Sequence, residues 1–251
     1  MEDTKGMSLK EYRVYAPEQI PVSEHDVKGE EYRRILEKVA KIIYHQKNLG
    51  IKEGIKGFIF HGEVGIGKTF IAKAIASKLG SYLVFVDGAD IARAYYGESE
   101  RQIASLFEVA ASKPHAIILI DDCESVFPRR DWIKGQSWHV AQNNVFFHCL
   151  DNLDTSKVAV ILTTNRFDLI DKAIIDRLYP IEFPLPNKQT LMEIAQAKCL
   201  KLKMKTDDII KAIDADPNNF KTVRHLEKYI IETYIKNVGK IQNDRFEFSS
   251  E

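Results

Sequence analysis

The sequence predicts an α/β fold, with a parallel five-stranded sheet between helices and a small all-helical domain after it. Short runs rich in β-branched and aromatic residues alternate with segments of helical length, and each run is apolar on both faces. Such runs are typical of parallel strands that are buried between helices. After residue 186 the β signal stops, and residues 188–236 show an apolar stripe with helical spacing. We therefore expect a domain boundary near residue 186.

The elements follow in order along the chain. Residues 1–25 are polar, contain two prolines and lack a sustained period, so we expect an extended N-terminal arm. A helix is expected from about Gly29, because apolar residues recur at helical steps as far as Ile43. Residues 26–186 are expected to form the α/β domain and residues 187–251 the helical lid, with a polar tail that frays from Asn237. The expected strands cover residues 58–61, 82–86, 116–120, 158–162 and 179–183.

Composition argues against several classes of protein. The chain of 251 residues has 36 Lys and Arg against 36 Asp and Glu, a balance that argues against a protein that works mainly on nucleic acid. Its apolar runs are far shorter than the roughly 20 residues that span a membrane, and the first ten residues have no apolar core of a secretory signal. Cys123, Cys149 and Cys199 are odd in number and share no metal-type spacing, which suits a reducing, cytoplasmic location.

The strongest motif is a complete G-x-x-x-x-G-K-T over residues 62–69, directly after an expected strand and at the start of an expected helix. Glycines let backbone N–H groups surround a phosphate, and the helix N-terminus favours its charge. Lys68 is expected to reach the β- and γ-phosphates, and Thr69 to place its hydroxyl on Mg²⁺. These residues predict the P-loop of an NTPase that binds ATP and Mg²⁺. The candidate nucleotide-binding residues are Gly62, Val64, Gly65, Ile66, Gly67, Lys68, Thr69 and Phe70.

Polar side chains follow two of the expected strands. Asp121 and Asp122 end the apolar run over residues 116–120, and Asn165 follows the run over residues 158–162. Asp121 is expected to hold Mg²⁺ through its water shell, and Asp122 to orient an attacking water. Asn165 is expected to hydrogen-bond that water or the γ-phosphate. Alternatively, the two acids cap the next helix, and the asparagine ends its strand for turn reasons.

Taken together, these motifs resemble those of the AAA+ ATPases, in particular the AAA subgroup of protein remodellers, over about residues 26–234. Residues 95–100 (YYGESE) are similar to the family's first pore loop and the signature that follows it. Residues 164–165 (TN) stand at its sensor-1 position, and residues 173–177 (AIIDR) at the place of its arginine finger. The resemblance implies a hexamer that hydrolyses ATP and acts on a protein substrate or adaptor.

The resemblance also implies residue roles. Tyr95, with Tyr96 and Gly97, would line the central channel and grip polypeptide, whereas Arg177 would act on the γ-phosphate of a neighbouring subunit. Val27 and Gly29 stand where the adenine-contacting segment begins. Arg224 resembles the sensor-2 arginine of other AAA+ clades, and a solvent-facing helix arginine is the equal alternative. Trp132 and Trp138, in the region of the second pore loop, and the histidines receive no role.

Two positions depart from the family's pattern. The family usually has Glu where this chain has Asp122, and the side chain that is one methylene shorter puts rapid turnover in doubt. Glu124, two residues on, is the substitute candidate. The finger region offers Arg177 alone where the family often has two arginines. Besides a protein remodeller, three other functions stay open: a slowly hydrolysing assembly module, which Asp122 favours, a nucleic-acid loader and a small-molecule P-loop kinase.

Overall fold

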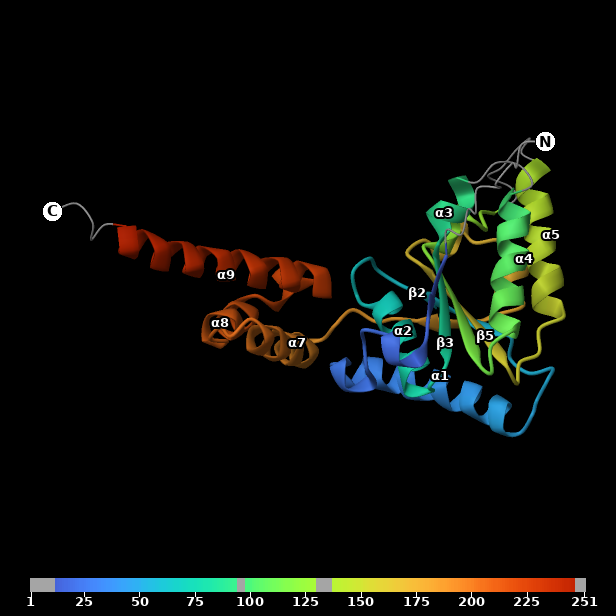
Figure 1. Ribbon diagram of the computed structural model, residues 1–251. Helices are drawn as coiled ribbons and strands as arrows, with labels where there is room; N and C mark the ends of the chain where they lie inside the picture. Colours follow the sequence, from blue (N-terminus) through green and yellow to red (C-terminus); the bar gives the residue numbers. More distant parts are fainter. Residues whose placement is uncertain (1–11, 94–97, 130–136, 247–251) are drawn as a thin grey trace, which may run out of the picture. The chain divides into compact units, whose positions relative to one another are not determined.

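The computed structural model describes residues 12–93, 98–129 and 137–246, which form two compact units (Figure 1). Within these ranges the larger unit comprises residues 12–26, Ile35–Gly62 and Lys68–Glu182. The smaller unit comprises Val27–Arg34, Glu63–Gly67 and the residues from Phe183 onward. The predicted α/β class is confirmed, whereas the domain boundaries proposed from the sequence stay a prediction.

The larger unit is built on a six-stranded sheet with the strand order β1-β3-β4-β5-β2-β6. Strand β1 runs antiparallel to β3, and the other neighbours are parallel. This order brings the carboxyl ends of β2, β4 and β5 to one edge, the position where open α/β sheets bind ligands. The strands are β1 (Arg13–Tyr15), β2 (Gly57–His61), β3 (Tyr82–Asp87), β4 (Ala116–Asp121), β5 (Val158–Thr164) and β6 (Tyr179–Glu182).

The expectation of five strands was wrong by one, because part of the N-terminal arm joins the sheet. Val14 lies opposite Val84 in the antiparallel pair, and the Tyr12 hydroxyl is 2.9 Å from Ser105 Oγ. A strand of three residues is too short to show a period in the sequence. Pairing with the edge of β3 therefore creates an element that local pattern does not predict.

Helices cover both faces of this sheet. Figure 1 shows α4 and α5 packed together on one side, and α1 and α2 on the other. α2 begins where the glycine-rich loop ends, and Asp122 separates β4 from the short η3 turn (Cys123–Ser125). The helices are α1 (Glu30–Asn48), whose first residues belong to the smaller unit, α2 (Lys68–Lys78), α3 (Gly88–Arg93), α4 (Glu98–Ala111), α5 (Ser137–Asp151) and α6 (Lys172–Ile175).

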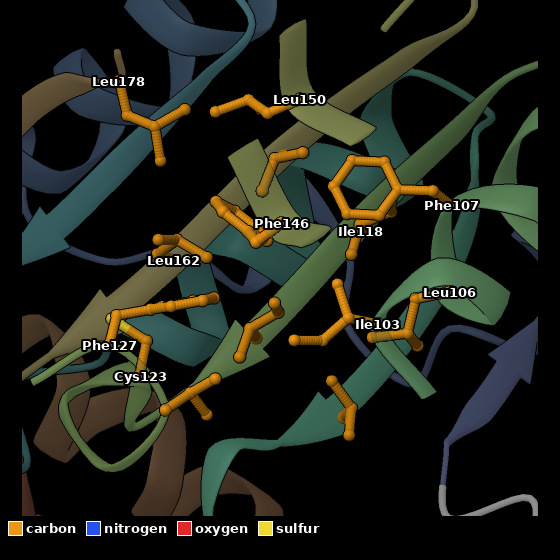
Figure 2. Close-up of a cluster of buried hydrophobic side chains, with 14 of the residues drawn as sticks. Ile103, Leu106, Phe107, Ile118, Cys123, Phe127, Phe146, Leu150, Leu162 and Leu178 are labelled. Atoms are coloured by element: carbon orange, nitrogen blue, oxygen red, sulfur yellow. The ribbon is translucent and has the colours of Figure 1, made fainter. Parts of the chain in front are cut away.

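A large apolar core fixes the strands beneath the site. Alternate residues of β4 and β5, among them Ile118 and Leu162, face the helices α4 and α5 (Figure 2). Phe146 stands at the centre of this layer, with its ring 4.4 Å from that of Phe127 and 5.7 Å from that of Phe107. Burial of this many aromatic and aliphatic side chains holds the ends of β4 and β5 in a defined register.

The smaller unit has a helical core of its own. Leu191 and Ala195 of α7 pack with Ile209 and Ile213 of α8 and with Leu226 and Ile230 of α9. Asn187 caps α7 by accepting a 2.9 Å hydrogen bond from Thr190 N. α9 continues to Phe246, past residue 236 where the expected helices end, and fraying of the polar tail stays a prediction. The helices are α7 (Lys188–Lys201), α8 (Asp207–Ala215) and α9 (Val223–Phe246), with the turn η6 (Pro217–Phe220).

No helix among the described residues has a stretch that is both long and apolar enough to cross a bilayer.

Candidate nucleotide site

The P-loop leads from β2 into α2. Its glycines at positions 65 and 67 have φ angles of 74° and 97°, which only glycine adopts without strain. Lys68 opens α2 and is buried, with 6% of its surface exposed. Its Nζ donates to Gly62 O at 2.9 Å and to Asn165 Oδ1 at 2.7 Å. The loop therefore has the open backbone and the placed cation that a phosphate chain requires.

Thr69 and Asp121 meet at the carboxyl end of β4. The Thr69 hydroxyl donates to Asp121 Oδ1 at 2.6 Å, and the Thr163 hydroxyl donates to the same oxygen. A hydroxyl and a carboxylate in contact are the protein ligands with which P-loop proteins hold Mg²⁺, directly and through water. Among the described residues, no group of three or more His, Cys, Asp or Glu is arranged to hold a metal. The Thr69 hydroxyl and the Asp121 carboxylate fit Mg²⁺ that is bound together with a nucleotide.

Asp122 adopts an unusual backbone conformation. Its φ and ψ angles are 48° and 52°, the left-handed region that short polar side chains tolerate best among non-glycine residues. Its N–H donates to Thr163 Oγ1 at 3.2 Å, and its Oδ1 accepts from Asn165 Nδ2 at 3.0 Å. Asp122 is open to solvent on one side, yet desolvation by the surrounding strand ends and the charge of Asp121 raise the pKa of its carboxyl group. Hydrogen bonds therefore fix both the backbone and the side chain of Asp122, and the pKa of its carboxyl group is raised.

Asn165 connects the cation to this carboxylate. Its amide oxygen accepts from Lys68, and its amide nitrogen donates to Asp122. The three side chains come from α2, the turn after β4 and the turn after β5. The structure thus brings together the residues that the sequence proposed for phosphate contact, metal binding and water activation.

Sequence reasoning gave no role to Thr163, which connects the two acids. Its hydroxyl donates to Asp121 and accepts from Asp122 N. The signal was present in the strand order, because Ile120 lies opposite Leu162 and Thr163 therefore stands beside Asp121. Neighbouring parallel strands place such residues in contact.

Arg177 lies in the larger unit, outside this cluster. Its Nε forms a 3.2 Å ion pair with Asp151 Oδ1, and its Nη1 donates to Ala173 O at 3.2 Å. The guanidinium also lies over the Phe147 ring, 4.5 Å from the centroid. These contacts orient a partly exposed cation, and an exposed pair of this kind contributes little to stability by itself.

The remaining candidate residues lie in the smaller unit, in and beside the P-loop, or outside the described residues. In the smaller unit, Arg224 N donates to Gly65 O at 3.0 Å, and Val27 is 2% exposed. A Cβ built on Gly65 would lie 2.7 Å from Arg224 Cβ, so this arginine is pressed against the loop. Val64 and Phe70 are exposed, whereas Ile66 is buried. The pore-loop candidates Tyr95, Tyr96 and Gly97, together with Trp132, lie outside the described residues, as does the side chain of Trp138.

Fold and site together define a P-loop nucleotide-binding protein of the parallel α/β class. The family model described as "ATPase family associated with various cellular activities (AAA)" matches residues 58–185. The chain belongs to this family of ATPases.

Curated relatives with known names give a consistent result. The chain is 32% identical to a "Cell division cycle protein 48 homolog" of Archaeoglobus fulgidus, over 79% of this chain and 28% of that protein. It is 30% identical to a "Proteasome-activating nucleotidase" of Thermococcus onnurineus, over 88% of this chain and 61% of that protein. A "26S proteasome regulatory subunit 8 homolog" of Schizosaccharomyces pombe is 29% identical over 78% of this chain and 51% of its own length. The matches thus span 28% to 61% of these relatives.

Proposed function

We propose that this chain hydrolyses ATP with Mg²⁺, assembles into a ring and uses the cycle to remodel a protein substrate. The observation that carries the proposal is the connected set Lys68–Asn165–Asp122, next to the Thr69–Asp121 pair. It supplies a cation for phosphate, a hydroxyl and carboxylate for metal, and a carboxylate that can accept a proton from water.

Each side chain has one task in this proposal. Lys68 binds and orients the phosphates, and Asp122 accepts the proton of the attacking water through its other carboxylate oxygen, Oδ2. Asn165 holds Asp122 by its amide nitrogen and thereby fixes the direction of that oxygen. Mg²⁺, held by Thr69 and Asp121, supplies neutralisation of phosphate charge when it is bound. Val27, Gly29 and Arg224 are proposed to complete the nucleotide contacts.

The ring and the protein substrate rest on different support. The family match and relatives named as proteasome-activating or proteasome-regulatory favour a protein remodeller over a nucleic-acid loader or a small-molecule kinase. Arg177 is proposed as the finger that acts on a neighbouring subunit, and Tyr95 as the residue that grips polypeptide. A cytoplasmic location is proposed because all three cysteines are free thiols.

A slowly hydrolysing assembly module is the second candidate, and Asp122 is the observation that favours it. Its carboxylate is shorter than the usual glutamate, and misplacement of a catalytic group by about 1 Å can cost about a hundredfold in rate. Under this alternative, binding of ATP and ring formation are intact, and hydrolysis serves only to reset the ring.

Phosphate release at increasing protein concentration tests the proposal. We expect the rate of phosphate release per subunit to rise to a plateau over the concentrations at which light scattering detects assembly in ATP. The Lys68→Ala variant is expected to release no phosphate. A rate per subunit that is independent of concentration, from a species that stays monomeric, would overturn the ring. An Asp122→Asn variant in ATP, used as a trap, then captures the protein substrate or adaptor, and Lys68→Ala is its control.

A further inference from the structure

A reciprocal pair of carboxylates joins the segment Val27–Arg34 to α7. From α7, Glu193 Oε2 accepts a 3.1 Å hydrogen bond from Gly29 N and a 2.6 Å ion-paired bond from Arg33 Nη2. These donors are a backbone N–H and a guanidinium, which make strong bonds to an ionised carboxylate. Both hold the pKa of Glu193 below its usual value, with the Gly29 N–H as the larger cause.

The second carboxylate points the other way. Glu31 Oε1 accepts from Thr190 Oγ1 at 2.7 Å, and Glu31 Oε2 accepts from Asn187 Nδ2 at 3.2 Å. Asn187 and Thr190 form the capped first turn of α7, where a negative charge is favoured by the helix dipole. Each element thus supplies a carboxylate to donors of the other.

The segment Val27–Arg34 packs closely against α7. Gly29 has a φ angle of 88°, and a Cβ built there would lie 2.5 Å from both Thr190 Cγ2 and Thr190 Oγ1. The Tyr32 hydroxyl donates to Pro184 O at 3.0 Å, and its ring stacks on Phe183 with centroids 6.1 Å apart. The backbone of the segment therefore lies directly against α7 and the residues that precede it.

Arg33 extends the connection to the start of the segment. Its Nε donates to Val27 O at 3.3 Å while its Nη2 binds Glu193. One carboxylate therefore fixes Gly29 directly and Val27 through Arg33. Within the proposed nucleotide site, these are the two residues that the family resemblance places at the start of the adenine-contacting segment.

We propose that Glu193 is a positioning residue for the adenine end of the nucleotide: it holds the backbone from Val27 to Gly29 in the arrangement that contacts the base. This inference rests on the proposed nucleotide site. Without Glu193 the segment must be ordered when the nucleotide binds, and this ordering weakens affinity. The phosphate contacts of Lys68 do not depend on Glu193, so only ligands that carry the base are affected.

Calorimetry with ATP and with tripolyphosphate separates the two ends of the ligand. For Glu193→Ala we expect the Kd for ATP to rise about tenfold, the scale of one charge-assisted hydrogen bond. Glu193→Gln keeps an acceptor for Gly29 N and is expected to lose less. The Kd for tripolyphosphate is expected to stay unchanged in both. Asp214→Asn removes another ion pair of the smaller unit, that of Lys188, and is the matched control without effect on either ligand.

Two outcomes with Glu193→Ala overturn the proposal: an unchanged Kd for ATP in a folded protein, or equal losses for ATP and tripolyphosphate, which indicate damage to the whole site. If Glu193→Ala does not fold, Glu193→Gln and Arg33→Met carry the same comparison. Wild-type protein that binds tripolyphosphate as tightly as ATP overturns the adenine role alone. ATP affinity that survives Lys68→Ala instead overturns the proposed function.

Discussion

Lys68 and Asn165 are joined by a 2.7 Å hydrogen bond from the ammonium to the amide oxygen. The amide nitrogen of Asn165 in turn donates to Asp122. Asn165 therefore connects the cation that is proposed to bind phosphate with the carboxylate that is proposed to act on water.

The first prediction is that Lys68→Ala abolishes ATP binding, because it removes the cation from the phosphate cradle. Calorimetric titration with ATP measures the loss. Lys73→Ala is the matched control, since Lys73 lies on the same helix and over the Phe85 ring, 4.7 Å from its centroid. Affinity that is unchanged in Lys68→Ala would contradict the assignment of the loop.

The second prediction concerns Arg177. Arg177→Ala should leave nucleotide binding intact and lower turnover, and fingers supplied by a neighbour can contribute on the order of 10³-fold. Mixing Arg177→Ala with Asp121→Asn should restore part of the activity, at interfaces where an intact site meets an intact arginine. Arg34→Ala, which breaks an exposed ion pair with Glu30, is the control. Absence of recovery at every mixing ratio, with a monomer in ATP, argues against action on a neighbour.

The strands were the most predictable part of the fold. The runs at residues 116–120 and 158–162 correspond to β4 and β5, because strands that are buried on both faces are apolar throughout. β1 was missed because pairing with β3, and not its own three residues, makes it a strand. The continuation of α9 to Phe246 was missed because a polar sequence does not by itself end a helix.

Site residues could be predicted from the sequence where a motif, or a position directly after an expected strand, identifies them. Lys68 and Thr69 follow from the loop motif, and Asp121 from its place after an apolar strand. Contacts such as that of Glu193 with Gly29 join residues 164 positions apart, and local sequence contains no signal for them. The roles of these residues stay predictions, whereas their proximity is a property of the fold.

The third prediction is a pH-dependent gain in stability. The pKa of Asp122 is raised in the folded state, by desolvation and then by Asp121, so ionised Asp122 opposes folding at neutral pH. This penalty is absent below the unfolded pKa and appears as pH rises through the folded pKa. Asp122→Asn should therefore raise the melting temperature at pH 7, and the gain should shrink as pH falls towards the ordinary carboxyl pKa.

Asp154 is the control of opposite sign. Hydrogen bonds from the Ser156 hydroxyl, and then from its N–H, lower the pKa of Asp154. Its stabilising effect is present above the unfolded pKa and is lost as pH falls through the folded pKa. Asp154→Asn should therefore lower the melting temperature at pH 7. A lower melting temperature at pH 7 for Asp122→Asn as well would contradict the destabilising effect assigned to ionised Asp122.

The fourth prediction decides between a fast remodeller and a slow assembly module. If the short side chain of Asp122 limits water activation, Asp122→Glu should raise kcat, by about a hundredfold at most, with little change in KM. The left-handed backbone at Asp122 favours a short polar side chain, so the site has a physical reason to hold Asp. If the pocket is shaped around Asp, the extra methylene instead lowers turnover.

Steady-state phosphate release by the wild type, Asp122→Glu and Asp122→Asn tests whether Asp122 activates the water, whether Asp122→Glu raises or lowers turnover. Asp122→Asn should lose nearly all activity, because an amide does not accept the proton of the attacking water. It should still bind ATP, since the Asn side chain retains an acceptor for Asn165 and leaves Lys68 in place. Hydrolysis by Asp122→Asn at the wild-type rate would show that Asp122 is not the catalytic carboxylate. Glu124→Gln would then be the variant that loses activity, because Glu124 is the next carboxylate along the turn.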